Sequence, residues 1–272
     1  MADWSEFVDV DFPSHERYVA GYSPRFRARA HRLCAGRFED AFEIVPHSQW
    51  KSMADALEEF SLADLITRIF DQGQEGSCVG NAGTQAHQVM QAAMVGLANV
   101  TQMSAVSLYK QIGSSPNSGA SVDDAIDRLG DTGILPLDND QNRKRFKHVF
   151  PATGFYSHWP DGWKETAGKF KGLQGHACQS VEEMMSALLR GMPVHVGRAG
   201  HSILYVRPRY DGSSLVIDYV NSWSEDWGFG LAGFKGGFGT DTARLYDESA
   251  DWCYAYGALD PSQWTWLEGS SA

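Results

Sequence analysis

The sequence predicts an α+β protein with two lobes, a helical lobe over about residues 66–150 and a lobe of mostly antiparallel strands over about residues 176–260. In the first segment, apolar residues recur every three or four positions, which is the period of helices buried on one face. In the second, short apolar runs are divided by turn residues, which is typical of strands. With 272 residues, the chain is long enough to bury a substantial core.

The charge composition of the chain argues against two kinds of partner. A net charge of −11 argues against nucleic acid or an anionic membrane as the main partner, and the short basic cluster Arg143–Arg145 is expected to be a solvated loop. The first thirty residues contain carboxylates and no apolar core of a signal peptide, and no apolar run is long enough to span a bilayer. We therefore expect neither a secretory signal nor a transmembrane segment.

Residues 1–43 are expected to form an N-terminal extension that packs on the main domain or on a partner, and residues 44–272 to form the main domain. The main domain is expected to contain mainly helices first and strands after them. The helical ones are a short pattern at Asp55–Phe60, a long helix from Cys78, a segment at Met103–Tyr109, and two helices capped by Ser121 and Ser180. A loop-rich link is expected at Phe155–Gly175, and strands at Val194–Val196, Ser202–Val206, Leu215–Val220 and Gly230–Lys235.

The stretch from Asp71 to Gln88 carries the strongest chemical signal. Glycines and a serine between Gln72 and Cys78 allow a tight loop that returns the amide side chain to the thiol. The apolar period that follows places Cys78 at a helix N-terminus, where the helix dipole and backbone N–H groups favour a thiolate. We predict that Cys78 is a nucleophile, and that Gln72 and the Cys78 backbone N–H stabilise an oxyanion.

Acyl transfer by a cysteine also needs an imidazole and a group that orients it. His201 opens a predicted strand, and Asn221 ends the next strand along the chain, where it would accept the imidazole N–H. His195 lies in mid-strand and is a weaker alternative. His176 with Cys178 suggests a metal pair, but no second pair has ligand spacing, so we expect no metal and no cofactor.

Together these residues resemble the papain-like cysteine peptidases over roughly residues 44–240. The order is Gln72, the Gly-Ser-Cys turn, Gly200-His201, Asn221-Ser222-Trp223 and Trp227-Gly228, and the spacing from cysteine to histidine and asparagine matches that family. The resemblance implies a cleft between the helical lobe and a β-barrel-like lobe, and a protein or peptide substrate. It also implies a Trp cover on the His–Asn bond and substrate contacts at Gly119, Gly197, Ser202 and Trp223.

Three departures from the family pattern matter. Glu75 stands where secreted members have a disulfide-bonded cysteine, and the four cysteines match no disulfide framework. This favours a reducing compartment, or a bacterial or viral (phage) member of the family, over a lysosomal or secreted one, so we expect the protein to be cytoplasmic or associated with a virus particle. Gly197 replaces a larger apolar residue, and only Arg198 to Gly200 lead to His201, so one cleft wall is expected to be short.

We expect a cysteine endopeptidase that acts through Cys78, His201, Asn221 and Gln72. An alternative is a structural or assembly protein, for example of a virus particle, that keeps the fold with little turnover and binds a protein partner through residues 1–43. An amidase or peptidoglycan hydrolase is less favoured, because those folds do not need an Asn-Ser-Trp strand.

Overall fold

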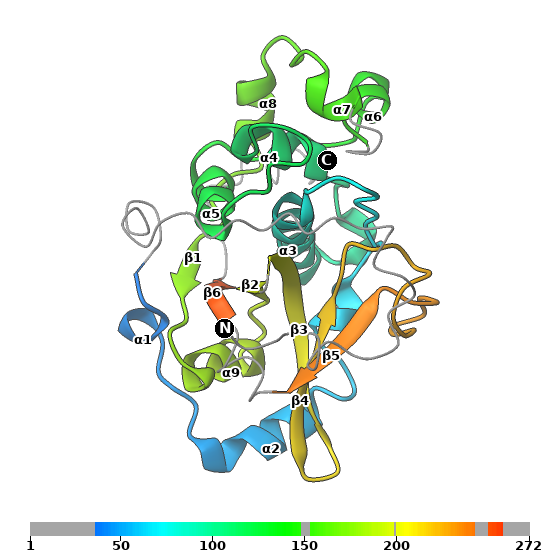
Figure 1. Cartoon of the computed structure of the whole chain (residues 1–272). Helices are drawn as coiled ribbons and strands as arrows, with labels where there is room; N and C mark the ends of the chain where they lie inside the picture. The colour runs from blue at the N-terminus through cyan, green and yellow to red at the C-terminus, as the bar shows by residue number, and fades with distance from the viewer. Residues whose placement is uncertain (1–35, 148–152, 199, 243–249, 258–272) are drawn as a thin grey trace.

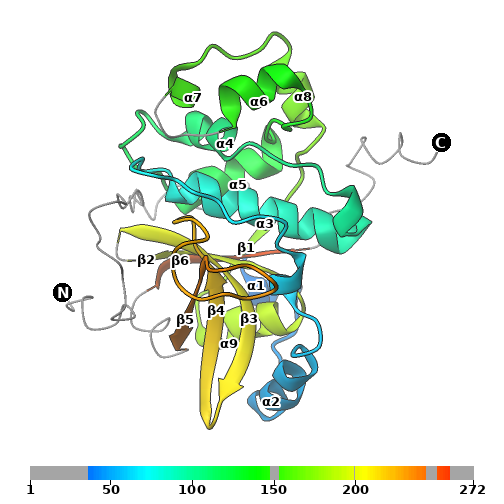
Figure 2. The same cartoon turned by 90° about the vertical axis from the view of Figure 1, so that its right-hand side faces the viewer.

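The structure is a computed structural model that describes residues 36–147, 153–198, 200–242 and 250–257. Figure 1 and Figure 2 show a helical lobe on one side of the molecule and a sheet on the other, with the long helix α3 between them. The two predicted lobes are confirmed.

The helical lobe is built around α3 (Cys78–Val95). Two short 3₁₀ helices, η3 (Leu62–Leu65) and η4 (Leu97–Asn99), flank it. The remaining helices of this lobe are α4 (Ala105–Ile112), α5 (Val122–Asp131), α6 (Asp140–Phe146), α7 (Thr153–Tyr156) and α8 (Trp163–Gly168). None of the helices in the described ranges has both the length and the apolar content needed to cross a bilayer.

The sheet has six strands: β1 (Gly175–Ala177), β2 (Val194–Arg198), β3 (His201–Asp211), β4 (Ser214–Val220), β5 (Phe238–Thr242) and β6 (Ala250–Tyr256). Their order is β1-β6-β2-β3-β4-β5, and every pair is antiparallel. The sheet is open within the part of the chain described, since β1 and β5 form its two edges. Helices α1 (Phe38–Ala41), α2 (His47–Ala56) and α9 (Val181–Leu189) belong to this lobe.

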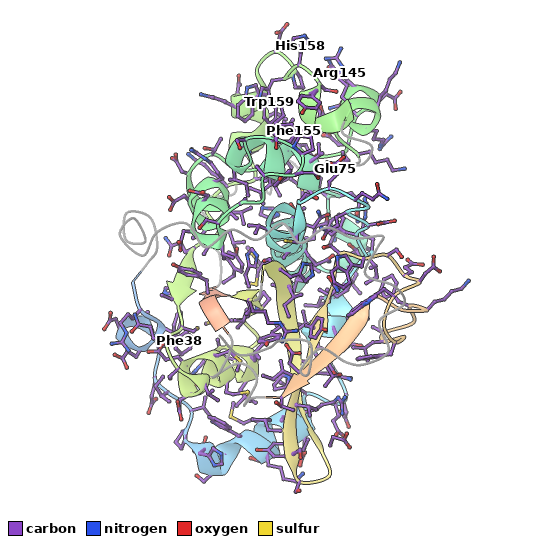
Figure 3. The ribbon with its side chains drawn as sticks, in the orientation of Figure 1. Phe38, Glu75, Arg145, Phe155, His158 and Trp159 are labelled. Atoms are coloured by element: carbon purple, nitrogen blue, oxygen red, sulfur yellow. The ribbon has the colours of Figure 1, made fainter. Side chains whose placement is uncertain are left out.

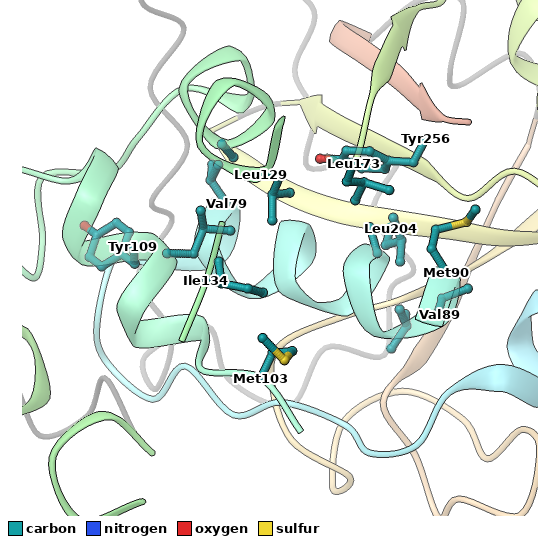
Figure 4. Packing of buried hydrophobic residues seen from close by; sticks show 14 of the residues in the cluster. Val79, Val89, Met90, Met103, Tyr109, Leu129, Ile134, Leu173, Leu204 and Tyr256 are labelled. Atoms are coloured by element: carbon teal, nitrogen blue, oxygen red, sulfur yellow. The ribbon is translucent and has the colours of Figure 1, made fainter. Parts of the chain in front are cut away.

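Two buried clusters cover the two faces of the sheet. Along β3, Leu204 and Val206 join the cluster around α3, whereas Ile203 and Tyr205 join the cluster that includes α9. This alternation is the period of a strand buried on both sides. Figure 4 shows the first cluster, which includes Val79, Tyr109, Leu129 and Ile134 and attaches the helical lobe to the sheet.

The predicted helix starts are confirmed. Cys78 is the first residue of α3. The side chain of Ser121 accepts a hydrogen bond from the Asp123 N–H at the start of α5, and that of Ser180 accepts one from the Glu183 N–H at the start of α9. Each hydroxyl thus caps an N–H group that has no partner inside its helix.

The predicted strand at Gly230–Lys235 is wrong. Those residues form turns, and the strand lies further on, at β5. Ala232 (φ 51°) and Gly233 (φ 88°) have left-handed backbone conformations, which interrupt a strand. The backbone of Gly236 packs closely against the carbonyl groups of Glu225 and Trp227, so this segment folds onto the preceding loop.

Several other boundaries differ from the expectation. The helix expected at Asp55–Phe60 begins earlier and ends at Ala56. Arg143–Arg145 is solvent-exposed as expected, but it belongs to helix α6 and not to a loop. The expected link at Phe155–Gly175 contains α8, and strands β1 and β6 were not predicted.

Residues 36–43, the described part of the predicted extension, pack on the β lobe. The Phe38 side chain on α1 (Figure 3) is 0% exposed and lies in the cluster with α9. Arg37 forms an ion pair of 3.1 Å with Glu183. The domain boundary at residue 43 stays a prediction. Residues 1–35, with Cys34, lie outside the described residues.

Candidate active site

Cys78 lies at the N-terminal end of α3, at the junction of the lobes (Figure 2). The turn before it is fixed by Asn81, whose side-chain N–H donates to the Ser77 carbonyl at 2.9 Å and to the Ser77 hydroxyl at 3.0 Å. α3 has no acidic residue in its first turn, so no carboxylate there opposes negative charge on Cys78.

Hydrogen bonds fix both the backbone and the side chain of Gln72. Its backbone N–H donates to the Ser222 carbonyl at 2.8 Å, and its side-chain oxygen accepts a hydrogen bond from the Ser222 hydroxyl. The side-chain Nε2 donates to the Glu75 carbonyl at 2.8 Å. These three hydrogen bonds fix the position of the Gln72 amide within the loop before Cys78.

His201 and Asn221 form the imidazole–amide pair that the sequence predicts. The distance from His201 Nε2 to Asn221 Oδ1 is 2.8 Å. Oδ1 also accepts from the Ser222 N–H at 2.7 Å, which is consistent with its being the carbonyl oxygen, so Nε2 is the protonated ring nitrogen. The other ring nitrogen, Nδ1, is buried and has no hydrogen-bond partner among the residues that the structure describes, so it is the one that can exchange a proton.

The surroundings of His201 favour a neutral imidazole. The pKa of His201 is lowered to about 4: burial is the main cause, the hydrogen bond to Asn221 acts in the opposite direction, and the positive charge of Arg198 contributes to the lowering. At neutral pH the ring is therefore uncharged and has a lone pair on Nδ1.

Two tryptophans cover this pair. Trp223 stacks on His201 with ring centroids 4.5 Å apart, and Trp227 meets Trp223 edge-on at 5.5 Å. Both indoles are buried. Trp223 therefore covers one face of the His201 ring, and Trp227 supports Trp223 from behind.

Gly119 lies in the loop that packs against the loop before Cys78. The Gly76 N–H donates to the Pro116 carbonyl at 2.8 Å, and a Cβ on Gly76 would lie 3.4 Å from the Gly119 nitrogen. Gly119 has φ 67°, which favours glycine. The loop is thus adjacent to the candidate nucleophile, while a contact of Gly119 with substrate stays a prediction.

The short connection beside His201 is confirmed, because β2 ends at Arg198 and β3 begins at His201. Gly197 is buried in β2 opposite Ser202. Ser202 is also buried, and its hydroxyl lies 2.7 Å from Nε2 of His195. This contact favours a structural role for Ser202 over the substrate contact that was expected.

The two rival histidines lie elsewhere. His195 is enclosed between Ser202 and the Tyr256 hydroxyl, and burial lowers its pKa to about 3. His176 lies in edge strand β1 and packs edge-on against Phe42. No group of three or more His, Cys, Asp or Glu side chains in the described ranges is arranged to hold a metal ion.

Sequence reasoning missed two contributors to the site. Ser222 positions Gln72 and Asn221, although it was noted only as part of the Asn-Ser-Trp sequence. Arg198 lies next to the connection that leads to His201 and forms a buried ion pair of 2.6 Å with Asp241. No local signal reveals this pair, since 43 residues separate its members.

Comparison with solved structures identifies the fold. The structure is similar to xylellain, a cysteine protease from Xylella fastidiosa, with a TM-score of 0.63 and 17% identity, over 90% of this chain and 98% of that one. It is also similar to a digestive procathepsin L2 proteinase from the larval midgut of Tenebrio molitor (TM-score 0.63, 15% identity, 90% and 80% of the chains). A third neighbour is the proform of the ragweed pollen cysteine protease Amb a 11 (TM-score 0.61, 16% identity, 90% and 77%).

No family model and no curated protein matches the sequence. The chain has the papain-like fold, and its structural neighbours are cysteine proteases.

Proposed function

We propose that this protein is a cysteine endopeptidase that cleaves peptide bonds of protein substrates. The observation that carries the proposal is the His201–Asn221 pair, in which Nε2 is held by a 2.8 Å hydrogen bond while the buried Nδ1 makes no hydrogen bond within the part of the chain described. Cys78 is the first residue of α3, and in the papain-like fold a histidine held in this way is suited to serve such a cysteine in acyl transfer.

In the proposed reaction, His201 Nδ1 takes the proton of the Cys78 thiol, and the thiolate attacks the carbonyl carbon of the scissile bond. Gln72 Nε2 and the Cys78 backbone N–H donate to the oxyanion. His201 then gives the proton to the leaving amine, which departs and leaves a thioester. A water molecule, deprotonated by His201, attacks the thioester and releases the acid and the thiol.

Replacement of the nucleophile tests this proposal. We expect Cys78→Ala to lower hydrolysis of a peptide library by at least about 10³-fold while the thermal midpoint is kept, because a small side chain is removed at a helix end. Cys253→Ala is the matched control, since it removes another buried thiol outside the site and should retain turnover. Undiminished hydrolysis by Cys78→Ala would show that the nucleophile is misassigned.

One observation favours the alternative of a structural or assembly protein. The connection from β2, which ends at Arg198, to β3, which begins at His201, is short, and we expect it to leave one wall of the cleft beside His201 short. Alkylation with iodoacetamide separates the alternatives. A catalytic Cys78 is labelled faster than free cysteine, and the labelling slows in His201→Ala. Labelling no faster than free cysteine favours the structural protein.

A further inference from the structure

Two other cysteines lie side by side in the β lobe. Cys178 directly follows β1, and Cys253 lies in β6. Both are buried in the cluster that includes α9, whereas Cys78 belongs to the cluster around α3. The pair is therefore on the opposite side of the sheet from the candidate nucleophile.

The backbone places these two cysteines opposite each other. β1 pairs with β6 through Ala177 and Tyr254, and one position further the Cys178 N–H donates to the Cys253 carbonyl at 2.9 Å. Opposite residues in a hydrogen-bonded antiparallel pair have Cα atoms about 5.5 Å apart, within the range of roughly 4.4–6.8 Å found for disulfides. The proximity of the Cys253 thiol, together with burial, raises the pKa of Cys178, and the Cys178 thiol lies 3.8 Å from the His176 carbonyl, to which it donates.

We propose that Cys178 and Cys253 form a reversible disulfide that joins the β1–α9 connection to β6. A small-molecule disulfide such as oxidised glutathione is the oxidant. One cysteine, as its thiolate, attacks a glutathione sulfur and releases one glutathione thiolate. The second cysteine loses its proton, attacks the protein sulfur of the mixed disulfide and releases the other glutathione, so two electrons pass from the protein to the oxidant.

The position of Cys178 and Cys253 between two neighbouring strands makes the proposed disulfide easy to reduce. Opposite Cβ atoms in a sheet lie about 4.5–5.5 Å apart, whereas a disulfide holds them about 3.5–4.5 Å apart, so closure draws the strands together. β1 has three residues and, on its side away from β6, a single bridge within the described ranges, from Ala177 to Arg37, so few hydrogen bonds must break for it to shift toward β6 and open locally to admit the oxidant. Strained disulfides are reduced more easily than relaxed ones, which makes this bond sensitive to the redox conditions.

The test uses the folded full-length chain in glutathione buffers of increasing oxidised fraction, followed by alkylation of the remaining thiols and digestion without reduction. We expect a cross-linked peptide pair that contains Cys178 and Cys253. The thermal midpoint of the oxidised chain should exceed that of the reduced chain by roughly 5 °C or more. Cys253→Ala should show neither effect, and Cys78→Ala should show both.

The wild-type measurements decide the question even if Cys253→Ala fails to fold. The proposal is wrong if Cys178 and Cys253 both remain alkylatable in the most oxidising buffer, including after refolding in it. It is also wrong if either one cross-links only to Cys34 or Cys78. In those cases the two residues are small buried apolar side chains of the core.

Discussion

His201 and Asn221 share one hydrogen bond, but the proposed chemistry depends on them unequally. His201→Ala removes the group that moves the proton, so we expect kcat to fall by roughly 10²–10⁴-fold. Asn221→Ala should lower kcat much less, because water can accept the Nε2 hydrogen bond in place of Oδ1. Steady-state kinetics of both variants checks this. Equal losses, with a lower thermal midpoint for Asn221→Ala, would mean that Asn221 mainly holds the strand end.

His87 makes stability depend on pH. It is buried in α3, where Nε2 lies 3.0 Å from the Phe170 carbonyl and Nδ1 lies 3.0 Å from Gln91 Nε2, so the ring is neutral with Nδ1 as acceptor. Burial lowers its pKa from 6.5 to about 4. Between these two values the unfolded chain binds more protons than the folded chain, so the free energy of unfolding falls as the pH falls through this window.

We expect His87 to account for a loss on the order of 3 kcal/mol between pH 7.5 and pH 4. Urea unfolding of the wild type and of His87→Gln at several pH values measures it. The difference in stability between the two proteins should shrink toward pH 4, because the variant has no imidazole to protonate. A constant difference would show that His87 is not the group that titrates.

At the scale of elements, the contact of α3 with α4 depends on Gly80. A Cβ on Gly80 would lie 2.6 Å from the Tyr109 Cβ, so the two helices pack too closely for a side chain there. We expect Gly80→Ala to lower the free energy of unfolding by about 1–3 kcal/mol, because the helices must separate.

Gly130 in α5 is the matched control for Gly80. A Cβ there meets only the Leu173 carbonyl at 3.6 Å, which is an ordinary contact. Gly130→Ala should raise the free energy of unfolding by about 0.5–1 kcal/mol, because alanine restricts the unfolded chain and favours the helix. Urea unfolding of both variants tests the pair. A similar change in both would contradict the close packing at Gly80.

At the scale of the whole molecule, the N-terminal segment attaches to the β lobe through residues 36–43. Deletion of residues 1–43 removes Phe38, which is fully buried, and the ion pair of Arg37 with Glu183. We expect this deletion to lower the free energy of unfolding by at least about 3 kcal/mol relative to deletion of residues 1–35. Phe38→Ala in the full chain is the control, and equal stability of the two deletions would contradict the prediction.

Because the two deletions should differ in stability, deletion of residues 1–35 is the better test of whether the N-terminal segment blocks the cleft or binds a partner. Deletion of residues 1–35 keeps the contacts of Arg37 and Phe38 with the β lobe, so a change in peptide hydrolysis at an unchanged thermal midpoint can be attributed to the removed residues. Faster hydrolysis of small peptides would support an extension that blocks the cleft. Unchanged hydrolysis would support one that binds a partner.

The sequence by itself determined the features that depend on neighbours along the chain. The N-terminal position of Cys78 on α3 follows from a Gly-Ser turn before an apolar helical period, and the starts of α5 and α9 follow from Ser121 and Ser180. The cores of β2, β3 and β4 follow from apolar runs between turn residues. These signals act over a few residues, so they can be recognised before the fold is known.

Only the tertiary structure decided the features that join distant segments. The residues expected to form a strand after Trp227 form turns instead, because the backbone at Gly236 packs on the carbonyl groups of Glu225 and Trp227. The strand β5 lies further along the chain, where it pairs with β4. The hydroxyl of Ser222 reaches Gln72 across 150 residues of sequence, and Arg198 meets Asp241 inside the sheet. Such contacts depend on which surfaces the packed lobes bring together, and no local pattern specifies them.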